Sequence, residues 1–195
     1  VVGELRNTII KYGGEVHFNH HITDFTYTIQ HDDSRKIAGV IAGGAEFTGA
    51  AVILATGHSA RDIFKLLYDS NILIEAKPFA LGVRVEHPQM LIDEIRYRQR
   101  PRNEYLPAAS YKLVTQINGR GVFSFCMCPG GFIVPAATAP GEVVVNGMSP
   151  SRRDSKYANS GIVVSVEESD FKSYNKFGPL AGMYFQSDIE KRACE

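Results

Sequence analysis

The chain has 195 residues, of which 44% are hydrophobic and 22% charged, as in an ordinary soluble globular protein. Lys and Arg together number 21, as do Asp and Glu, so the net charge of +0 gives no electrostatic reason to expect nucleic acid or a membrane as partner. No apolar run approaches the roughly 20 residues that span a bilayer, and the first residues lack the features of a signal peptide. The three cysteines, an odd number without zinc spacing, argue against a secreted disulfide framework and predict a protein of the reducing cytoplasm. Because the chain begins without Met and inside a helical pattern, we expect an internal piece of a longer protein.

The first quarter of the chain predicts a helix followed by a β-meander. Apolar residues recur at helical spacing from Val2 to Ile10, and a glycine pair at Gly13 and Gly14 follows as a stop signal. Alternation of apolar and polar residues then marks a half-buried strand, and a second glycine pair marks the turn of a hairpin. Strands are predicted at residues 15–18, 22–29, 36–42 and 46–48.

The next segment differs, because residues 50–55 (AAVILA) are continuously apolar. Such a run, bounded by turn signals, is typical of a strand covered on both faces in an α/β sheet. It leads into a turn at Thr56, Gly57 and His58 and then into a predicted helix of about three turns, whose apolar residues are Ile63, Phe64, Leu66 and Leu67.

A change of pattern near residues 75–78 predicts a domain boundary. We expect residues 1–76 to be part of one domain, and residues 77–195 to be an incomplete, β-rich second domain. The predicted fold class is α/β plus α+β, with the meander in the first domain. In the second domain, strands are predicted at 79–86, 111–116, 122–126, 133–135, 142–146 and 162–167, helices at 89–95 and from about 179, a break at 87–88 and an exposed loop at 96–104.

The order of helix, meander, buried strand and Ala-Thr-Gly exit resembles flavoproteins of the glutathione reductase class. In those proteins this series follows the dinucleotide-binding unit, and the returning strand ends in a small-residue turn close to the flavin. Only glycine, which has no Cβ, lets the backbone approach a ring that closely. A buried strand that ends in an ordinary glycine turn is the structural alternative.

Five longer motifs make the resemblance narrower and cover almost the whole chain. In order, they are residues 55–62 (ATGHSARD), 77–89 (KPFALGVRVEHPQ), 120–131 (RGVFSFCMCPGG), 145–149 (VNGMS) and 153–161 (RDSKYANSG). They resemble a bacterial family of uncharacterised FAD-dependent dehydrogenases. The resemblance implies FAD as cofactor and redox chemistry, and it implies no particular substrate. It also implies that residues 1–76 are the C-terminal part of a Rossmann-like FAD-binding domain with a meander, joined to the β-rich second domain.

Two parts of an FAD site are missing from this sequence. It contains no Gly-x-Gly-x-x-Gly turn, whose backbone amides hold the pyrophosphate, and no late Gly-Glu or Gly-Asp segment of the kind that closes over the flavin. We therefore expect the chain by itself to bind FAD weakly or not at all.

Five residues are the cofactor-binding candidates: Ile22, Thr56, Gly57, His58 and Asn159. The resemblance places Ile22 at the adenine edge and the three turn residues beside the flavin. The alternatives are an apolar strand residue for Ile22 and, for His58, a helix cap shared with the following serine.

The catalytic residues are unknown from sequence, with Cys126, Cys128 and His58 as candidates. The two cysteines should share one face of a strand, where a mutual disulfide would be strained. Their apolar neighbours favour buried, unreactive thiols near the ligand over a thiol presented to substrate.

Several other polar residues could have either a structural or a functional role. Arg84 and Glu86 share a predicted strand face and could pair. A loop with Asn159 near its end suits substrate or flavin-edge contacts, or is a solvated turn. The histidines have no compact metal-ligand spacing, so no metal is predicted. The polar residues of that loop are Arg152, Arg153, Asp154, Asn159 and Ser160; the histidines are His17, His20, His21 and His31.

The sequence thus predicts part of an FAD-dependent oxidoreductase that moves a hydride or electron pair between flavin and an unknown small molecule. NADH or NADPH is a candidate electron donor, although the sequence does not identify the donor, and neither nucleic acid nor a membrane is an expected partner. The alternatives are a flavin-binding module without catalysis and a Rossmann-like domain that has lost its cofactor.

Overall fold

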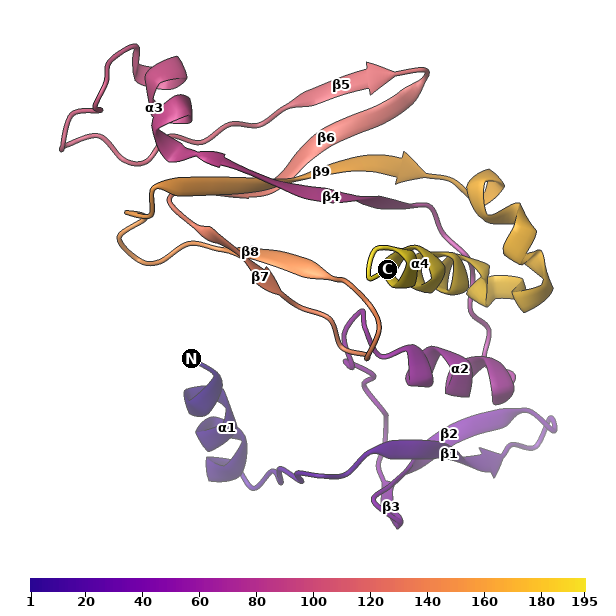
Figure 1. Cartoon of the computed structure of the whole chain (residues 1–195). Coiled ribbons are helices and arrows are strands. Elements are labelled where there is room, and N and C mark those ends of the chain that lie inside the picture. Colours follow the sequence, from indigo (N-terminus) through magenta and orange to yellow (C-terminus); the bar gives the residue numbers. More distant parts are fainter. The chain divides into compact units, whose positions relative to one another are not determined.

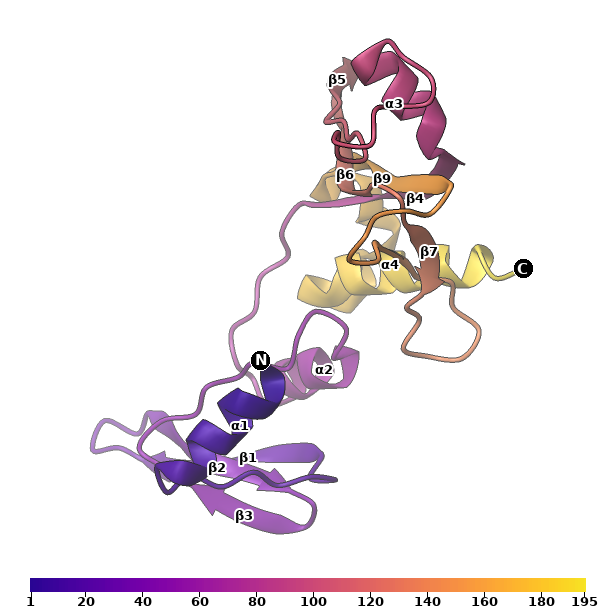
Figure 2. The ribbon, with the colours of Figure 1, turned by 90° about the vertical axis from the view of Figure 1, so that its left-hand side faces the viewer.

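The computed structural model describes all 195 residues, which form two compact units, unit 1 (Val1–Ile74) and unit 2 (Glu75–Glu195). The division lies beside the boundary predicted between residues 76 and 77. Figures 1 and 2 show the ribbon from two directions. The function assigned to each unit from sequence stays a prediction.

Unit 1 contains the predicted β-meander, whose three strands pair antiparallel in the order β1-β2-β3 (Figure 1). Gly43 and Gly44 have positive φ angles of 58° and 79°, which glycine adopts without strain and which the tight β2–β3 turn requires. The elements are α1 (Val2–Lys11), β1 (Ile22–Ile29), β2 (Arg35–Ala42), β3 (Ala45–Thr48) and α2 (Arg61–Asp69).

The core of unit 1 is small. Its buried apolar residues are Phe25 on β1, Ala42 on β2 and Ile63 on α2. The helix α1 has no buried residue, and its apolar residues Val2 and Leu5 are 83% and 61% exposed. A helix whose apolar residues face water gains little stability from this unit alone.

Two predicted strands of unit 1 are wrong. Residues 15–18 and 50–55 belong to no strand, and Ile53, expected between two covering layers, is 90% exposed. A continuously apolar strand forms where parallel neighbours and helices cover both faces, and the chain supplies neither for this segment. All strand pairs of the chain are antiparallel, so its fold is mixed α and β with antiparallel sheets, and no Rossmann-like sheet is present.

Unit 2 is built on a four-stranded antiparallel sheet with the order β4-β9-β6-β5. A second sheet, the hairpin β7–β8, contacts β4, β6 and β9. In both views the helix α3 (Gln89–Tyr97) continues from one end of β4 (Figures 1 and 2). The strands are β4 (Phe79–Pro88), β5 (Val114–Ile117), β6 (Arg120–Cys128), β7 (Phe132–Pro135), β8 (Val145–Met148) and β9 (Tyr157–Val166).

Two helical segments of unit 2 close an aromatic core at the end of the sheet away from α3. They are a 3₁₀ segment η1 (Glu168–Leu180) and the helix α4 (Ala181–Arg192). Phe171 of η1 and Val166 of β9 are buried, and Phe79 of β4 and Phe185 of α4 pack against them. The rings of Phe79 and Phe171 stack with centroids 6.0 Å apart, within the range of favourable aromatic pairs.

An ion pair fixes the start of η1. The Arg120 guanidinium donates to both carboxylate oxygens of Asp170, and the backbone N–H of Glu167 donates to Asp170 Oδ2 over 2.8 Å. The hydrogen bonds from Arg120 and then from the Glu167 backbone lower the pKa of Asp170 from 3.8 to about 2. The pair therefore links β6 to the turn that follows β9.

Several boundaries in unit 2 differ from the sequence prediction. β4 continues through the predicted break to Pro88, which is tolerated because β4 is an edge strand. β9 begins at Tyr157, five residues before the predicted start at 162, so the polar residues Asn159 and Ser160 lie in the strand. The segment η1 was not predicted. None of the helices is long and apolar enough to cross a membrane.

Candidate functional site

A partly buried polar cluster lies where β4, β6 and β9 meet, and its centre is Arg84. In the strand register Arg84 is opposite Gly161, and Asn159 lies two residues along β9, so both side chains point to the same face. Arg84 Nη1 donates to Asn159 Oδ1 over 2.5 Å and to the Cys126 carbonyl over 3.2 Å, and it lies 3.9 Å from Cys128 Sγ. Sequence motifs far apart in the chain therefore meet in this Arg84 cluster.

Asn159 is the most buried member of the Arg84 cluster. Its side chain has no exposed surface, and its Nδ2 atom has no hydrogen-bond partner. A buried amide donor without a partner costs free energy, so such groups are rare and call for an explanation. The prediction that Asn159 and Ser160 belong to a loop, solvated or ligand-binding, is wrong, because both are fully buried strand residues.

A β-bulge separates the two cysteines. The register of β6 against β9 shifts between Phe125 and Cys128, and Cys126 has a positive φ of 44°. Cys126 is exposed, whereas Cys128 is half-buried with its Sγ 3.5 Å from the Cys126 carbonyl. The prediction that both cysteines are buried is therefore wrong for Cys126, because a bulge breaks the two-residue alternation on which the shared face depended.

The hairpin β7–β8 packs its backbone directly on the Arg84 cluster. A Cβ placed on Gly147 of β8 would collide with Arg84, Asn159 and Cys128. Only glycine fits at this position, because a side chain would displace the cluster or the hairpin. The VNGM strand and the ANSG strand, which are separated in the sequence, are thereby held together.

The turn after Cys128 is anchored from three directions. Gln89 Oε1 of α3 accepts from the Gly130 backbone N–H over 2.7 Å, and Ser149 Oγ donates to the Pro129 carbonyl over 2.9 Å. Gly130 has a φ of 52° and lies against the backbone of Arg153, where a Cβ would clash. The Pro129-Gly130-Gly131 turn is consequently buried and fixed in place.

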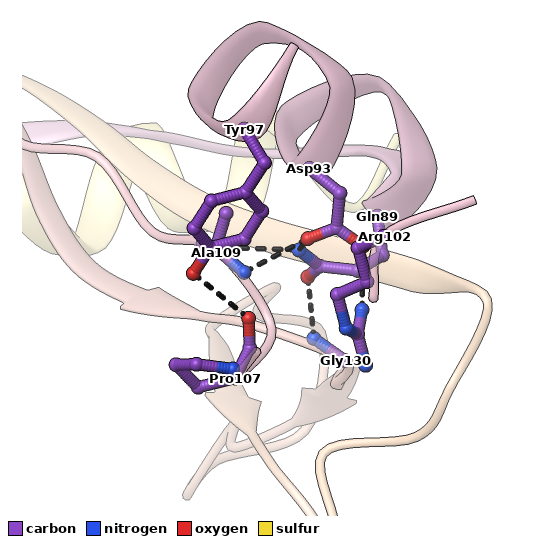
Figure 3. A network of polar contacts seen from close by, with 7 residues as sticks. All are labelled: Gln89, Asp93, Tyr97, Arg102, Pro107, Ala109 and Gly130. Atoms are coloured by element: carbon purple, nitrogen blue, oxygen red, sulfur yellow. Dashed lines mark hydrogen bonds and ion pairs between the residues drawn. The ribbon is translucent and has the colours of Figure 1, made fainter. Parts of the chain in front are cut away.

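Figure 3 shows the network on α3 that holds Gln89. Asp93 is buried, and its carboxylate accepts from Gln89 Nε2 over 2.8 Å, from the Ala109 backbone N–H over 2.9 Å and from Arg102 Nη1 over 2.5 Å. Gln89 Nε2 also donates to the Ala109 carbonyl over 3.0 Å. Each donor of this network meets an acceptor, so the network rigidly connects α3, the 98–113 loop and the Pro-Gly-Gly turn.

Sequence reasoning missed most of these residues. It considered Arg84 only as a partner for Glu86, and that pairing is wrong, because Arg84 bonds Asn159 instead. Gln89 and Asp93 gave one usable signal, their spacing of four residues on a predicted helix, which brings polar side chains together. Nothing in the sequence connects them to Gly130.

The turn at Thr56, Gly57 and His58 lies in unit 1 and is fully exposed. Gly57 has a φ of 79°, and nothing lies within 4 Å of the position a Cβ would take. The alternative role of His58 and Ser59 as a helix cap is wrong, because α2 has Ala60 at its N-cap and no side-chain cap. Ile22 is the first residue of β1 and is half-buried.

The histidines of unit 1 make other contacts. His17 Nε2 lies 2.7 Å from Glu15, and His21 lies 3.2 Å from Asp62. The rings of His17 and His20 meet Phe47 edge-on. No group of three or more His, Cys, Asp or Glu side chains is placed to hold a metal ion.

Comparison with known proteins assigns the class to which unit 2 belongs. Residues 78–195 match the model of a family described as FAD-dependent protein, C-terminal domain-like, and the chain belongs to this family. The matched residues contain the Arg84 cluster and the α3 network.

A curated relative from Clostridium beijerinckii, described as an uncharacterized protein, is 44% identical over 195 residues. The alignment covers 99% of this chain and 35% of the relative. The chain thus spans about a third of the relative's length.

The residues present fit one part of an FAD molecule. The exposed turn at Gly57, with open space where a side chain would stand, allows the close approach of a flat ring. The chain has no glycine-rich turn for a pyrophosphate. If this turn lies against the flavin, other residues have to bind the phosphates of the cofactor.

Proposed function

We propose that the chain is part of an FAD-dependent oxidoreductase that moves a hydride or an electron pair between flavin and a small-molecule substrate. The observation that carries the proposal is the match of residues 78–195 to a family of FAD-dependent proteins. Bound FAD would supply the redox chemistry, and the protein would bind, orient and tune it. NADH or NADPH is the electron donor we propose.

Within this proposal, unit 1 contributes to the FAD-binding domain of the longer protein. The glycine at residue 57 supports this, as do the exposed apolar residues of α1 and of the 50–55 segment. Apolar surface of this kind is stabilised when other protein elements cover it. The backbone of Thr56, Gly57 and His58 would then lie against the flavin, with Ile22 at the adenine end.

Unit 2 contributes a rigid polar framework in the same proposal. The Arg84 cluster and the Pro-Gly-Gly turn are held by buried hydrogen bonds, as ligand-binding groups need to be. Asn159 would donate its unpaired amide Nδ2 to the cofactor or substrate after a small rearrangement. Its burial supports a positioning role over direct contact in the present conformation.

The first test is the visible spectrum of the purified full-length protein. We expect a flavin spectrum that is bleached by dithionite and by NADH or NADPH, with turnover in a screen of electron acceptors. A flavin that no nicotinamide cofactor reduces and no acceptor reoxidises would point to the non-catalytic flavin-binding module. Absence of flavin after reconstitution with FAD would contradict the whole proposal.

Gly57→Val tests the turn. A β-branched residue at φ 79° is strained and fills the space through which a ring would approach, so we expect flavin to be lost on purification. Gly119→Val is the matched control, because Gly119 has a φ of 78° and equally open surroundings in the β5–β6 turn. Equal flavin content in both variants would remove residues 56–58 from the flavin site.

A further inference from the structure

Arg84 keeps most of its hydrogen-bonding capacity unused. All three of its contacts are made by Nη1, to Asn159, the Cys126 carbonyl and Cys128, so its Nε and Nη2 atoms donate to no protein group. The side chain is half-buried and has no carboxylate partner. A partly buried guanidinium without a counter-charge is unfavourable, because its desolvation is not repaid by an ion pair.

A cleft of about 450 Å³ opens beside Arg84. Most of its wall is apolar, with Phe125 and Val163 from the four-stranded sheet, Val145 from β8 and Ile189 from α4. Gly161 lies opposite both Arg84 and Phe125 in the register, so no side chain stands between them. Apolar clefts of this size with a few polar groups are typical of small-molecule sites.

We propose that this cleft binds a small monocarboxylic acid with an apolar body, and that Arg84 binds its carboxylate. The planar guanidinium matches a carboxylate through two parallel hydrogen bonds, which the free Nε and Nη2 atoms can donate. The valine, isoleucine and phenylalanine side chains then cover the apolar body. Glu190 lines the same cleft, so a second negative charge on the ligand would be repelled near it.

This binding site does not depend on the proposed redox function, since it is defined by unit 2 alone. If the full-length protein proves to be an oxidoreductase, the site names the class of molecule expected as its substrate or effector. Flavin absorbance recorded on the same samples keeps the two proposals apart. A protein without flavin can still bind the acid, and a flavoprotein can fail to bind it.

The test compares acids with their neutral amides. Phenylacetate and octanoate, each paired with its primary amide, are titrated calorimetrically into the full-length protein. We expect the acids to bind at least about tenfold more tightly than the amides, because only the acids gain charge-assisted hydrogen bonds. Arg84→Gln should remove this preference, and Arg84→Lys should keep part of it.

Two further variants control for folding and position. Val145→Trp fills the cleft from β8 at a residue that makes no hydrogen bond to Arg84, and it should weaken acid and amide alike, which keeps the test valid if Arg84→Gln fails to fold. Arg96→Gln removes an exposed arginine outside the cleft and should change nothing. Equal affinity for acid and amide, no binding of either acid, an acid preference that survives Arg84→Gln, or binding that survives Val145→Trp would each overturn the proposal.

Discussion

Unit 1 and unit 2 differ in how much of their structure is buried. Unit 1 buries three apolar residues and no polar side chain, whereas unit 2 has an aromatic core and all the buried polar residues of the chain. The buried polar residues are Gln89, Asp93, Glu142, Asn159, Ser160 and Glu190. Hydrogen bonds of the unit 2 interior join distant elements of that unit and help to specify its fold, while unit 1 leaves a helix and an apolar segment exposed.

Producing the two units as separate chains should give the largest difference in thermal unfolding. We expect residues 75–195 to unfold in one cooperative thermal transition, because this unit contains its own core, and residues 1–74 to show none. Circular dichroism during heating of the two pieces measures this. A cooperative transition in residues 1–74 would show that unit 1 also folds by itself, contrary to this prediction.

Asp93→Ala should destabilise unit 2 more than substitution of either cysteine or of Asp170. It leaves Gln89, Arg102 and the Ala109 N–H without their buried acceptor, at a cost of about 3–5 kcal/mol in the free energy of unfolding. Urea unfolding measures the loss, with Asp154→Ala at an exposed site as the matched control. A cost below about 1 kcal/mol would show that the α3 network does not hold unit 2 together.

The cysteines test how far the buried region of unit 2 extends. Cys128→Ala should cost about 1 kcal/mol in lost packing, while Cys126→Ala, at an exposed position, should cost less than about 0.5 kcal/mol. Iodoacetamide should label Cys126 before Cys128 in the folded protein. Rapid labelling of Cys128 with loss of activity would instead make it a working thiol.

Asp170→Asn should cause the smallest loss of stability of these variants, and the loss should depend on pH. Folding lowers the pKa of Asp170 from 3.8 to about 2, so the ion pair with Arg120 stabilises the fold fully above pH 3.8 and is lost as the pH falls through 2. The variant should therefore have a slightly lower Tm than the wild type at pH 7, and this difference should shrink towards pH 2. A Tm difference that stays constant with pH would assign the effect to packing.

Local sequence patterns correctly predicted the helices and strands whose formation depends on residues nearby in the sequence. Alternation of side chains predicted β1, the glycine pair at 43–44 predicted the β2–β3 hairpin, and helical spacing predicted α1 and α2. The resemblance drawn from five motifs is confirmed in part, because residues 78–195 match a family of FAD-dependent proteins. Each of these signals lies within about ten residues, where backbone preferences and side-chain period act directly.

Strand pairing, burial and the β-bulge depend on residues far apart in the sequence, so only the tertiary structure revealed them. Residues 50–55 have the composition of a buried strand but form none, because no neighbouring strand of this chain pairs with them. Asn159 and Ser160 look like loop residues in sequence, yet they lie buried in a central strand, where Arg84 from β4 provides the hydrogen bond that Asn159 needs. The bulge at Cys126 likewise depends on pairing with β9, because the register of two strands is fixed by contacts that neither strand contains alone.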